Sequence, residues 1–284
     1  MSDARSIGFF DSGVGGLTVL REVMRRLPNE STIYLGDNAR APYGPRSDDE
    51  VRRFSAECLD ELAARDVKAI VVACNTSSAI ALPQLRLRYD RPLLGVVRPG
   101  ATAAALATRN QHVGVIATVA TVRSRAYFQA IKEEDPFVEV DELATPKLVP
   151  LVEAGQLDGP LVEEVVGEQI GPMLSADRGI DTLLLGCTHY PLLGPVIRRL
   201  IGPEIAVIDS ASATASALAA LLEMHSLAAP EGAQPTHIQL TTGKVETFSR
   251  IAGRLFESTF TSVEHLDIPG VVMPVGAPAA AVGE

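Results

Sequence analysis

The 284-residue chain contains no tryptophan, and aromatic residues make up only 5% of it. Because hydrophobic residues still account for 46%, its cores must consist of Val, Leu, Ile and Ala, which is typical of parallel-sheet proteins. Cysteine is also rare: Cys58, Cys74 and Cys187 are an odd and small set, which argues against a disulfide framework and for a reducing compartment. The length predicts about two domains.

Long hydrophobic runs are missing as well. No stretch approaches the roughly 18 uncharged residues that a membrane-spanning helix requires, so we expect no membrane partner. Residues 1–6 lack the basic and apolar regions of a signal peptide, and we therefore expect a cytoplasmic protein. The formal net charge of −10 argues against nucleic acid as a partner, because DNA binding depends on Lys and Arg side chains. A small anion can still bind to backbone N–H groups at helix N-termini.

Cofactor motifs are absent too. The glycine-rich segment after the first apolar run lacks the last glycine of the dinucleotide pattern, because Thr18 occupies that position, and no Walker A sequence occurs. No Cys-x-x-Cys or His-Glu-x-x-His pair indicates a zinc site. None of the lysines lies in a context that indicates a Schiff base with pyridoxal phosphate. We therefore expect no cofactor and no metal.

What the chain does contain is a regular alternation of short apolar runs and segments of helical periodicity. This alternation is typical of βαβ units with parallel pairing. We expect helices over residues 17–27, 48–65 and 160–175, the second opened by a capping box at Ser47. The expected strands cover residues 7–10, 32–35, 69–73, 93–97, 113–117, 138–140, 182–185, 206–208 and 237–240.

A faint internal duplication runs through these elements. The strand at 7–10 is followed by Asp11, and Cys74 comes 63 residues later; the strand at 113–117 is followed by Thr118, and Cys187 comes 69 residues later. Two related halves that face each other across a cleft explain this spacing. We therefore predict an α/β fold with two doubly wound, mainly parallel-sheet domains, related by pseudo-two-fold symmetry, and with the site in the cleft between them.

Cys74 and Cys187 are the strongest candidates for chemistry. Each directly follows an apolar run and precedes small polar residues, and ligands of open α/β sheets bind just past the carboxyl ends of strands. A thiol at a helix N-terminus has its pKa lowered by the helix dipole, so we expect reactive thiols. Either cysteine alone could be structural, but two in matching positions favour function. Cys58 lies inside the helix expected over 48–65, and we interpret it as a core residue.

Two loops of the first half add polar candidates. Asp11 and Ser12 open a glycine-rich turn between a strand and a helix, where an anion is favoured. Tyr43 and Gly44 lie in a Pro/Gly turn that follows the second strand within ten residues. Both loops therefore belong to the same rim of strand ends.

The second half has its own candidates. Thr118 and Thr121 flank a short loop after a strand, where they can cap a helix or contact a carboxylate. His189 lies two residues after Cys187 and could tune that thiol. Glu153 is an isolated acid in an apolar segment, for which solvent exposure is the simpler explanation and support of the site the alternative.

Taken together, these motifs resemble glutamate racemase, of the aspartate/glutamate racemase family. The match extends from about residue 7 to residue 257 in the family's order and spacing. The matching residues are Asp11-Ser12-Gly13-Val14-Gly15-Gly16-Leu17, Gly36-Asp37 with Pro42-Tyr43-Gly44, Cys74-Asn75-Thr76, Thr118 with Thr121, and Leu185-Gly186-Cys187-Thr188-His189-Tyr190-Pro191. The resemblance implies that a second α/β domain (98–207) is inserted into the first (1–97 plus 208–265). Residues 266–284, rich in Pro, Gly and Ala, are predicted to form a poorly ordered tail.

The resemblance also implies an activity, namely cofactor-independent interconversion of L- and D-glutamate that supplies D-glutamate for peptidoglycan and hence for cell-wall biogenesis and cell shape. Cys74 and Cys187 would be the acid/base residues, and Asp11, Glu153 and His189 would assist them. The residues that would line the substrate are Asp11, Ser12, Tyr43, Gly44, Asn75, Thr76, Thr118, Thr121, Thr188 and His189. Glutamate is then the expected partner, and the sequence leaves open whether the chain is a homodimer.

Three alternatives remain at this point. A racemase for aspartate or another acidic amino acid would use the same two thiols. A dithiol redox protein would need the two Cα atoms within about 7 Å, whereas opposing bases leave room for a substrate. A binding protein could retain the cleft without turnover.

Overall fold

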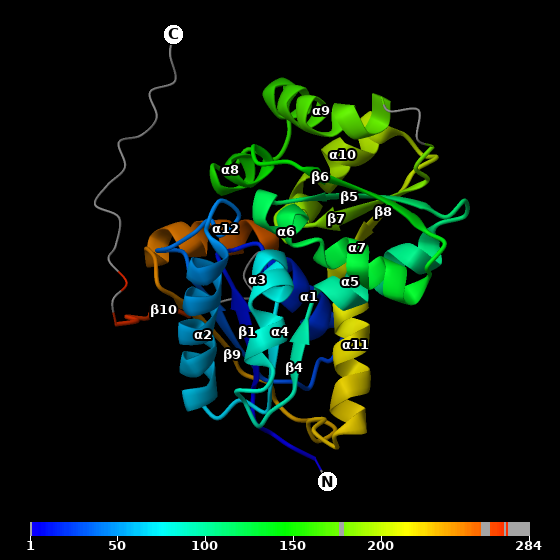
Figure 1. The fold of residues 1–284 in the computed structure, drawn as a ribbon. Helices are drawn as coiled ribbons and strands as arrows, with labels where there is room; N and C mark the ends of the chain where they lie inside the picture. Colours follow the sequence, from blue (N-terminus) through cyan, green and yellow to red (C-terminus); the bar gives the residue numbers. More distant parts are fainter. Residues whose placement is uncertain (1, 176–178, 257–261, 270, 272–284) are drawn as a thin grey trace.

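Two parallel sheets organise the fold in a computed structural model, which describes residues 2–175, 179–256, 262–269 and 271. The six-stranded sheet has the order β10-β9-β2-β1-β3-β4 and the four-stranded sheet the order β6-β5-β7-β8, with all pairs parallel. Figure 1 shows the first sheet in the lower half of the molecule and the second in the upper half. The strands are β1 (Ile7–Asp11), β2 (Thr32–Gly36), β3 (Ala69–Val72), β4 (Leu93–Gly95), β5 (His112–Ala117), β6 (Glu139–Ala144), β7 (Thr182–Gly186), β8 (Ala206–Asp209), β9 (His237–Thr241) and β10 (Val263–His265).

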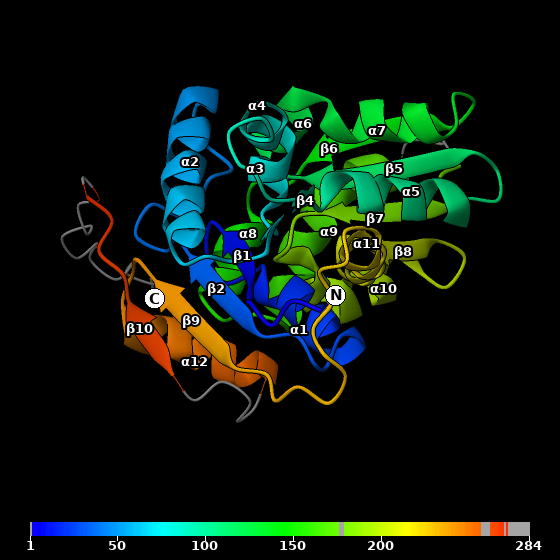
Figure 2. The same cartoon turned by 90° about the horizontal axis from the view of Figure 1, so that it is seen from below.

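Helices cover both faces of the first sheet. Successive residues of a strand point to opposite sides, so both faces carry apolar side chains that must be buried. Phe10 and Val72 pack on one side with residues of α2, whereas Phe9 and Val71 pack on the other with residues of α1 and α11. Figure 2 shows α2 and α1 on opposite sides of β1 and β2. The helices are α1 (Leu17–Arg26), α2 (Asp48–Ala64), α3 (Asn75–Ile80), α4 (Leu82–Leu85), α5 (Val97–Ala107), α6 (Val119–Ser124), α7 (Ala126–Glu134), α8 (Leu148–Glu153), α9 (Pro160–Ser175), the 3₁₀ helix η1 (Tyr190–Leu193), α10 (Gly194–Ile201), α11 (Ser210–Met224) and α12 (Val245–Phe256).

The two sheets repeat the same strand order. Within the larger sheet the order β2-β1-β3-β4 matches β6-β5-β7-β8 in the smaller one, so β1 corresponds to β5 and β3 to β7. The predicted fold class, two doubly wound parallel-sheet α/β domains, is thereby confirmed. The chain leaves the first sheet after β4 and returns to that domain with α11, which packs on α1. Because β8 runs to Asp209, it crosses the expected domain limit between residues 207 and 208, and the division of the chain stays a prediction.

Three strands differ from the sequence expectation by more than one residue at an end. β4 ends at Gly95 instead of residue 97, because α5 begins at Val97. β6 covers Glu139–Ala144 rather than 138–140. It is an edge strand with acidic, half-exposed residues, so its sequence lacks the continuous apolar run of a buried strand. The short edge strand β10 was not expected at all. The capping box at Ser47 is confirmed, with Glu50 bonded back to the Ser47 backbone.

The sequence prediction starts the poorly ordered tail at residue 266, but the chain there is still in contact with the first domain. Leu266 donates its backbone N–H to the carbonyl of Thr241, and Ile268 is buried against the core beside α2. The prediction is therefore wrong for residues 266–269, which add apolar contacts to the first domain. Residues 270 and 272–284 lie outside the described residues. In the described part of the chain no helix has the length and hydropathy to cross a membrane.

Candidate active site

The carboxyl ends of four central strands carry the candidate residues. Asp11 ends β1 and Cys74 follows β3 in the first sheet; Thr118 follows β5 and Cys187 follows β7 in the second. Because β1 corresponds to β5 and β3 to β7, the two cysteines occupy equivalent positions in the two domains. Both side chains are buried, and both thiols are free.

Cys74 is held at the start of α3. Its thiol donates to the Ser12 hydroxyl over 3.4 Å, and its sulfur accepts the backbone N–H of Ser77 over 3.5 Å. Burial raises the pKa of the Cys74 thiol, and the nearby Asp11 carboxylate raises it further. The expectation of a thiol with a lowered pKa is therefore wrong for Cys74, because loss of solvation outweighs the dipole of a helix only six residues long.

Cys187 has a basic neighbour. Its Sγ lies 3.8 Å from Nδ1 of His189, and the other ring nitrogen, Nε2, lies 3.5 Å from Oε1 of Glu153 at the end of α8. Burial alone would lower the pKa of His189, but its contacts with Cys187 and Glu153 outweigh burial and hold this pKa well above the usual value. The raised pKa favours the protonated form of His189, whose ring lies next to the second thiol.

The loop after β1 joins the two thiol environments. Asp11 accepts the backbone N–H of Gly13 over 2.9 Å and, through its other oxygen, the hydroxyl of Thr188 over 3.3 Å. Since Ser12 contacts Cys74 and Thr188 adjoins Cys187, neighbouring residues of one loop reach both sites. Gly15 lies so close to the second domain that a Cβ there would come within 2.5 Å of Thr188 Oγ1 and of His189 Nδ1.

Three threonine hydroxyls form a closed cluster between the domains. Thr76 Oγ1 lies 2.9 Å from that of Thr118 and 3.2 Å from that of Thr121, and the last two are 3.0 Å apart. Gly44 lies against Thr118, where a Cβ would come within 2.9 Å of the threonine Cβ. The cluster places neutral hydrogen-bond donors where two loops of different domains meet.

Tyr43 is held by contacts within the first domain. Its ring is buried against Phe10 and Phe54, and its hydroxyl donates to Asp37 in the first domain. Asp37 also accepts from Arg40 and from Thr242, each over 2.7 Å. The tyrosine side chain therefore anchors its loop to the core, and contact of Tyr43 with a substrate stays a prediction.

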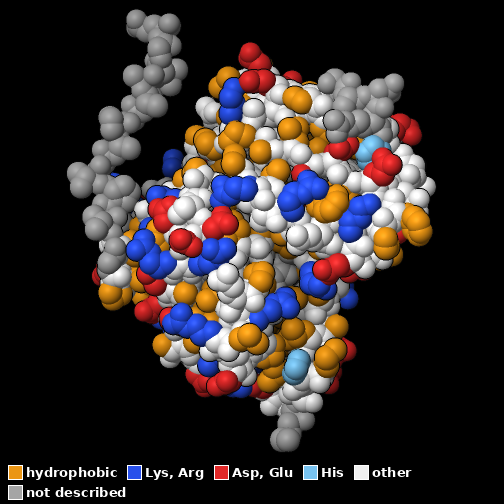
Figure 3. All heavy atoms as spheres, viewed as in Figure 1, with side chains coloured by type: hydrophobic (Ala, Val, Ile, Leu, Met, Phe, Trp, Pro, Cys, Tyr) orange, Lys and Arg blue, Asp and Glu red, His pale blue; other side chains and the backbone are white. Residues whose placement is uncertain are grey.

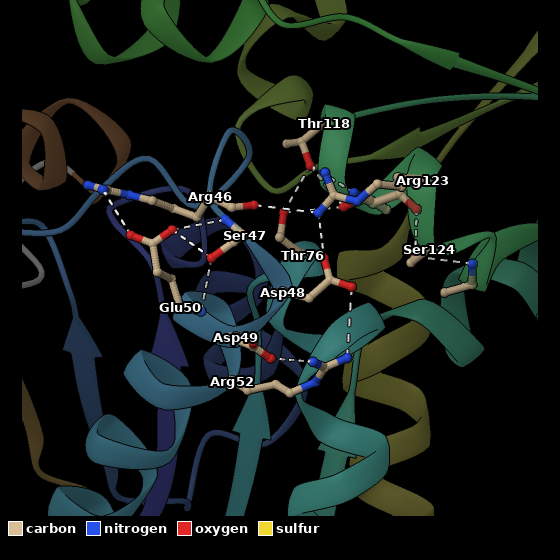
Figure 4. A network of polar contacts seen from close by, with 12 residues as sticks. Arg46, Ser47, Asp48, Asp49, Glu50, Arg52, Thr76, Thr118, Arg123 and Ser124 are labelled. Atoms are coloured by element: carbon tan, nitrogen blue, oxygen red, sulfur yellow. Dashed lines mark hydrogen bonds and ion pairs between the residues drawn. The ribbon is translucent and has the colours of Figure 1, made fainter.

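The rim above the threonine cluster is closed by contacts between the domains. Arg123 of α6 pairs with Asp48 at the start of α2 and bonds the backbone carbonyl of Arg46, while Ala120 donates its N–H to the carbonyl of Gly44 over 3.1 Å. Figure 4 shows Arg123 reaching Asp48 beside Thr76 and Thr118. Figure 3 shows side chains of both charges along the middle of this face, where the domains meet. The strand-end residues Cys74, Thr76 and Thr118 are buried next to these contacts.

The comparisons with known proteins agree with this geometry. The Asp/Glu/Hydantoin racemase family matches residues 15–218. The chain belongs to this family. A glutamate racemase from Exiguobacterium sibiricum is 48% identical over 248 residues, which cover 87% of this chain and 91% of that protein.

Solved structures give the same result. Glutamate racemase isoform RacE1 from Bacillus anthracis matches with a TM-score of 0.89 and 42% identity over 93% of this chain and 98% of that one. Glutamate racemase from Francisella tularensis in complex with D-glutamate matches with a TM-score of 0.87 and 33% identity over 94% and 99%. The resemblance to the aspartate/glutamate racemase family that the sequence motifs indicated is confirmed.

In this racemase-family chain, contacts link the strand-end loops that carry the sequence candidates: Ser12 with Cys74, Asp11 with Thr188 and Thr76 with Thr118. The structure also adds residues that the motifs missed. Tyr127 of α7 accepts a hydrogen bond from Asn75, and Arg40 supports the Asp37–Tyr43 contact. Of the residues in these contacts, only Asp37 was indicated by the sequence, because it belongs to the Gly36-Asp37 pair that matches the family. For Tyr127 no local pattern in the sequence distinguishes it from any core tyrosine.

His189 predicts a specific pH dependence of stability. A pKa raised in the folded state stabilises the fold fully below the unfolded value of about 6.5, and this contribution is lost as the pH rises through the folded pKa. Near pH 6 the free energy of unfolding of the protein should exceed that of His189→Asn by on the order of 1 kcal/mol, and thermal unfolding between pH 6 and 9 should show this difference shrinking as the pH rises. Parallel pH profiles would contradict a raised pKa of His189 in the folded protein.

Proposed function

We propose that the protein interconverts L- and D-glutamate without a cofactor, with Cys74 and Cys187 as bases on opposite faces of the substrate. The observation that carries this proposal is the placement of the two thiols at equivalent strand ends, with the Asp11–Ser12 segment in contact with both loops. The similarity of the chain to glutamate racemases, one of them bound to D-glutamate, supports glutamate as the substrate.

Each thiol would perform one half of the proton exchange. A thiolate removes the α-hydrogen as a proton, and the opposite thiol delivers its own proton to the other face of Cα, so that no proton is gained or lost overall. Contacts with Cys187 and Glu153 raise the pKa of His189 beside Cys187, and burial and Asp11 raise the pKa of Cys74. In the ligand-free protein one sulfur would be a thiolate and the other a thiol, and their roles would exchange with the direction of the reaction.

The hardest requirement is stabilisation of the deprotonated intermediate. Its α-carboxylate gains negative charge as the α-proton leaves, and fixed donors in a buried site stabilise such charge most effectively. Backbone N–H groups and the side chains of Asn75, Thr76 and Thr188 are the donors that we assign to this task. All three side chains are buried at the strand ends, next to one or the other cysteine in the chain or in the threonine cluster.

The biological role follows from the resemblance. D-glutamate made in the cytoplasm would supply peptidoglycan synthesis, and both the role and the compartment stay predictions. A bacterial strain that depends on added D-glutamate should grow without it when it expresses the protein.

The direct test is circular dichroism of L-glutamate incubated with the purified protein, without added cofactor. We expect the signal to decay to zero as D-glutamate forms, and an equal decay of opposite sign from D-glutamate. Faster decay with L-aspartate would reassign the substrate, and no decay with any acidic amino acid would favour a binding protein. Loss of both thiols to an intramolecular disulfide under mild oxidant would favour a redox protein instead.

A further inference from the structure

Tyr127 lies between the loops that carry the two cysteines. It belongs to α7 of the second domain, and its side chain is fully buried. Neither the sequence motifs nor the proposed proton exchange gives it a role. Its contacts nevertheless reach residues directly adjacent to both thiols.

The hydroxyl end of Tyr127 contacts the first domain. Nδ2 of Asn75, the residue after Cys74, donates to the tyrosine oxygen over 2.6 Å. Ser210, the first residue of α11, where the chain returns from the second domain to the first, lies near the hydroxyl: a Cβ at Gly100 would come within 3.0 Å of the Ser210 Cβ and 3.5 Å of the tyrosine oxygen. Burial raises the pKa of Tyr127, so the group stays a neutral hydroxyl that can both donate and accept.

The ring end of Tyr127 contacts the second thiol loop. A Cβ at Gly186, the residue before Cys187, would come within 2.9 Å of Cε2 of the ring. A Cβ at Gly100 of α5 would lie 3.5 Å from the hydroxyl oxygen. Two glycines therefore leave the space that the ring fills, and a rigid aromatic side chain extends from the residue before Cys187 to the residue after Cys74.

Asn75 depends on this contact for its orientation. Its amide nitrogen is bonded to Tyr127, while its Oδ1 is buried and has no hydrogen-bond partner within the described residues. A buried amide with one bonded end has a single preferred rotamer, whereas an amide without a partner pays the cost of lost solvation and can turn. The tyrosine hydroxyl therefore decides where the amide of Asn75 points.

We propose that Tyr127 is a positioning residue for racemisation, which holds Asn75 and the Cys74 loop in register with the Cys187 loop across the domain junction. The inference rests on the proposed function, because it assumes that the two thiols act on one substrate. In this role Tyr127 acts only by fixing positions and transfers no proton. It keeps the separation of two loops from different domains, and a misplacement of about 1 Å at a reacting centre can cost about 100-fold in rate.

The test is Tyr127→Phe, which keeps the ring and removes only the hydroxyl. We expect kcat/KM for glutamate to fall by about 10- to 100-fold. Because the two enantiomers have equal free energies, the fall must be the same in both directions. The matched control is Tyr89→Phe, which removes a hydroxyl that bonds Asp60 and Ala56 far along the first domain from the thiols, and which should leave kcat/KM within about twofold of the unmodified protein.

A double-mutant cycle with Asn75→Ala separates positioning from general destabilisation. If Tyr127 acts through Asn75, adding Tyr127→Phe to the Asn75→Ala variant should lower kcat/KM further by less than about twofold. Equal losses in both backgrounds would overturn the proposal, as would unchanged kcat/KM in the single variant. Thermal unfolding of each variant, measured alongside, shows that the proteins are folded at the assay temperature.

Isotope effects give a readout that a merely structural role would not move. The hydroxyl supports the Cys74 side, so proton transfer at Cys74 should slow more than transfer at Cys187. With α-deuterated L- and D-glutamate, the primary isotope effect on kcat/KM should rise in Tyr127→Phe for one enantiomer only. Equal changes for both enantiomers would count against the inference. Failure of the unmodified protein to racemise glutamate would instead sink the proposed function, so the two failures are distinguishable in one set of assays.

Discussion

Cys74→Ser and Cys187→Ser should each reduce racemisation in both directions by at least about 100- to 10,000-fold, the range that a positioned acid/base group contributes. The reason is that inversion needs a proton acceptor on one face of Cα and a donor on the other. Each sulfur lies at the end of a different sheet, so neither can serve the far face when its counterpart is lost. Polarimetry on each enantiomer measures the loss.

The matched control for the two thiols is Cys58→Ser. Cys58 is buried in the middle of α2, where its sulfur accepts a hydrogen bond from Arg40 over 3.5 Å, and a serine hydroxyl can accept the same bond. We expect kcat within about threefold of the unmodified protein and a modest loss of thermal stability. Turnover by Cys74→Ser or Cys187→Ser comparable with that of Cys58→Ser would rule out the two-base assignment.

The surviving thiol of each variant gives a further readout. In D₂O it can still exchange the α-hydrogen of the one enantiomer whose hydrogen faces it, without inversion. Deuterium should therefore enter L-glutamate with one variant and D-glutamate with the other. The pattern assigns each cysteine to its enantiomer, and label entering both enantiomers with a single variant would contradict bases on opposite faces.

The fold and the thiol positions could be predicted because the relevant signals are local. A buried parallel strand such as β7 is a continuous apolar run, and its end is marked in the sequence by the first polar residues, so Cys187 could be placed at a strand end without coordinates. The duplication of the two sheets was visible as similar spacing from Asp11 to Cys74 and from Thr118 to Cys187. The repeated strand order explains that spacing.

Properties that depend on packing between distant segments could not be predicted. The raised pKa of Cys74 depends on burial under the second domain and on Asp11, which a helix-dipole argument does not include. The hydroxyl of Tyr43 bonds Asp37, and its ring packs with Phe10 and Phe54, which are distant from it in the sequence. Tyr127 contacts Asn75 from 52 residues away in sequence, so nothing near it indicates its role.

Gly15 carries the second large prediction, because it packs against the Thr188–His189 segment that follows Cys187. An alanine Cβ would lie 2.5 Å from Thr188 Oγ1 and 2.5 Å from His189 Nδ1, and real Cβ atoms do not come that close. The loop cannot simply retreat, since Thr18 Oγ1 bonds both the carbonyl of Gly15 and, over 3.3 Å, that of Thr188. Gly15→Ala must therefore displace the residues that follow Cys187, and we expect kcat/KM to fall by about 100-fold or more.

The control for Gly15→Ala is Gly167→Ala on α9, where a Cβ meets nothing within 4 Å. Alanine is favoured over glycine inside a helix by about 1 kcal/mol, so Gly167→Ala should raise the unfolding midpoint and leave kcat/KM unchanged. Gly15→Ala should lower the midpoint by an amount that corresponds to overpacking, about 1–3 kcal/mol. If its kcat/KM stayed within threefold of the unmodified protein, the contact between the β1 loop and the Thr188–His189 segment would not hold the second thiol in place. The two-domain geometry would then have to be maintained by other contacts, of which the Thr76–Thr118–Thr121 cluster and the Arg123–Asp48 pair are the next to test.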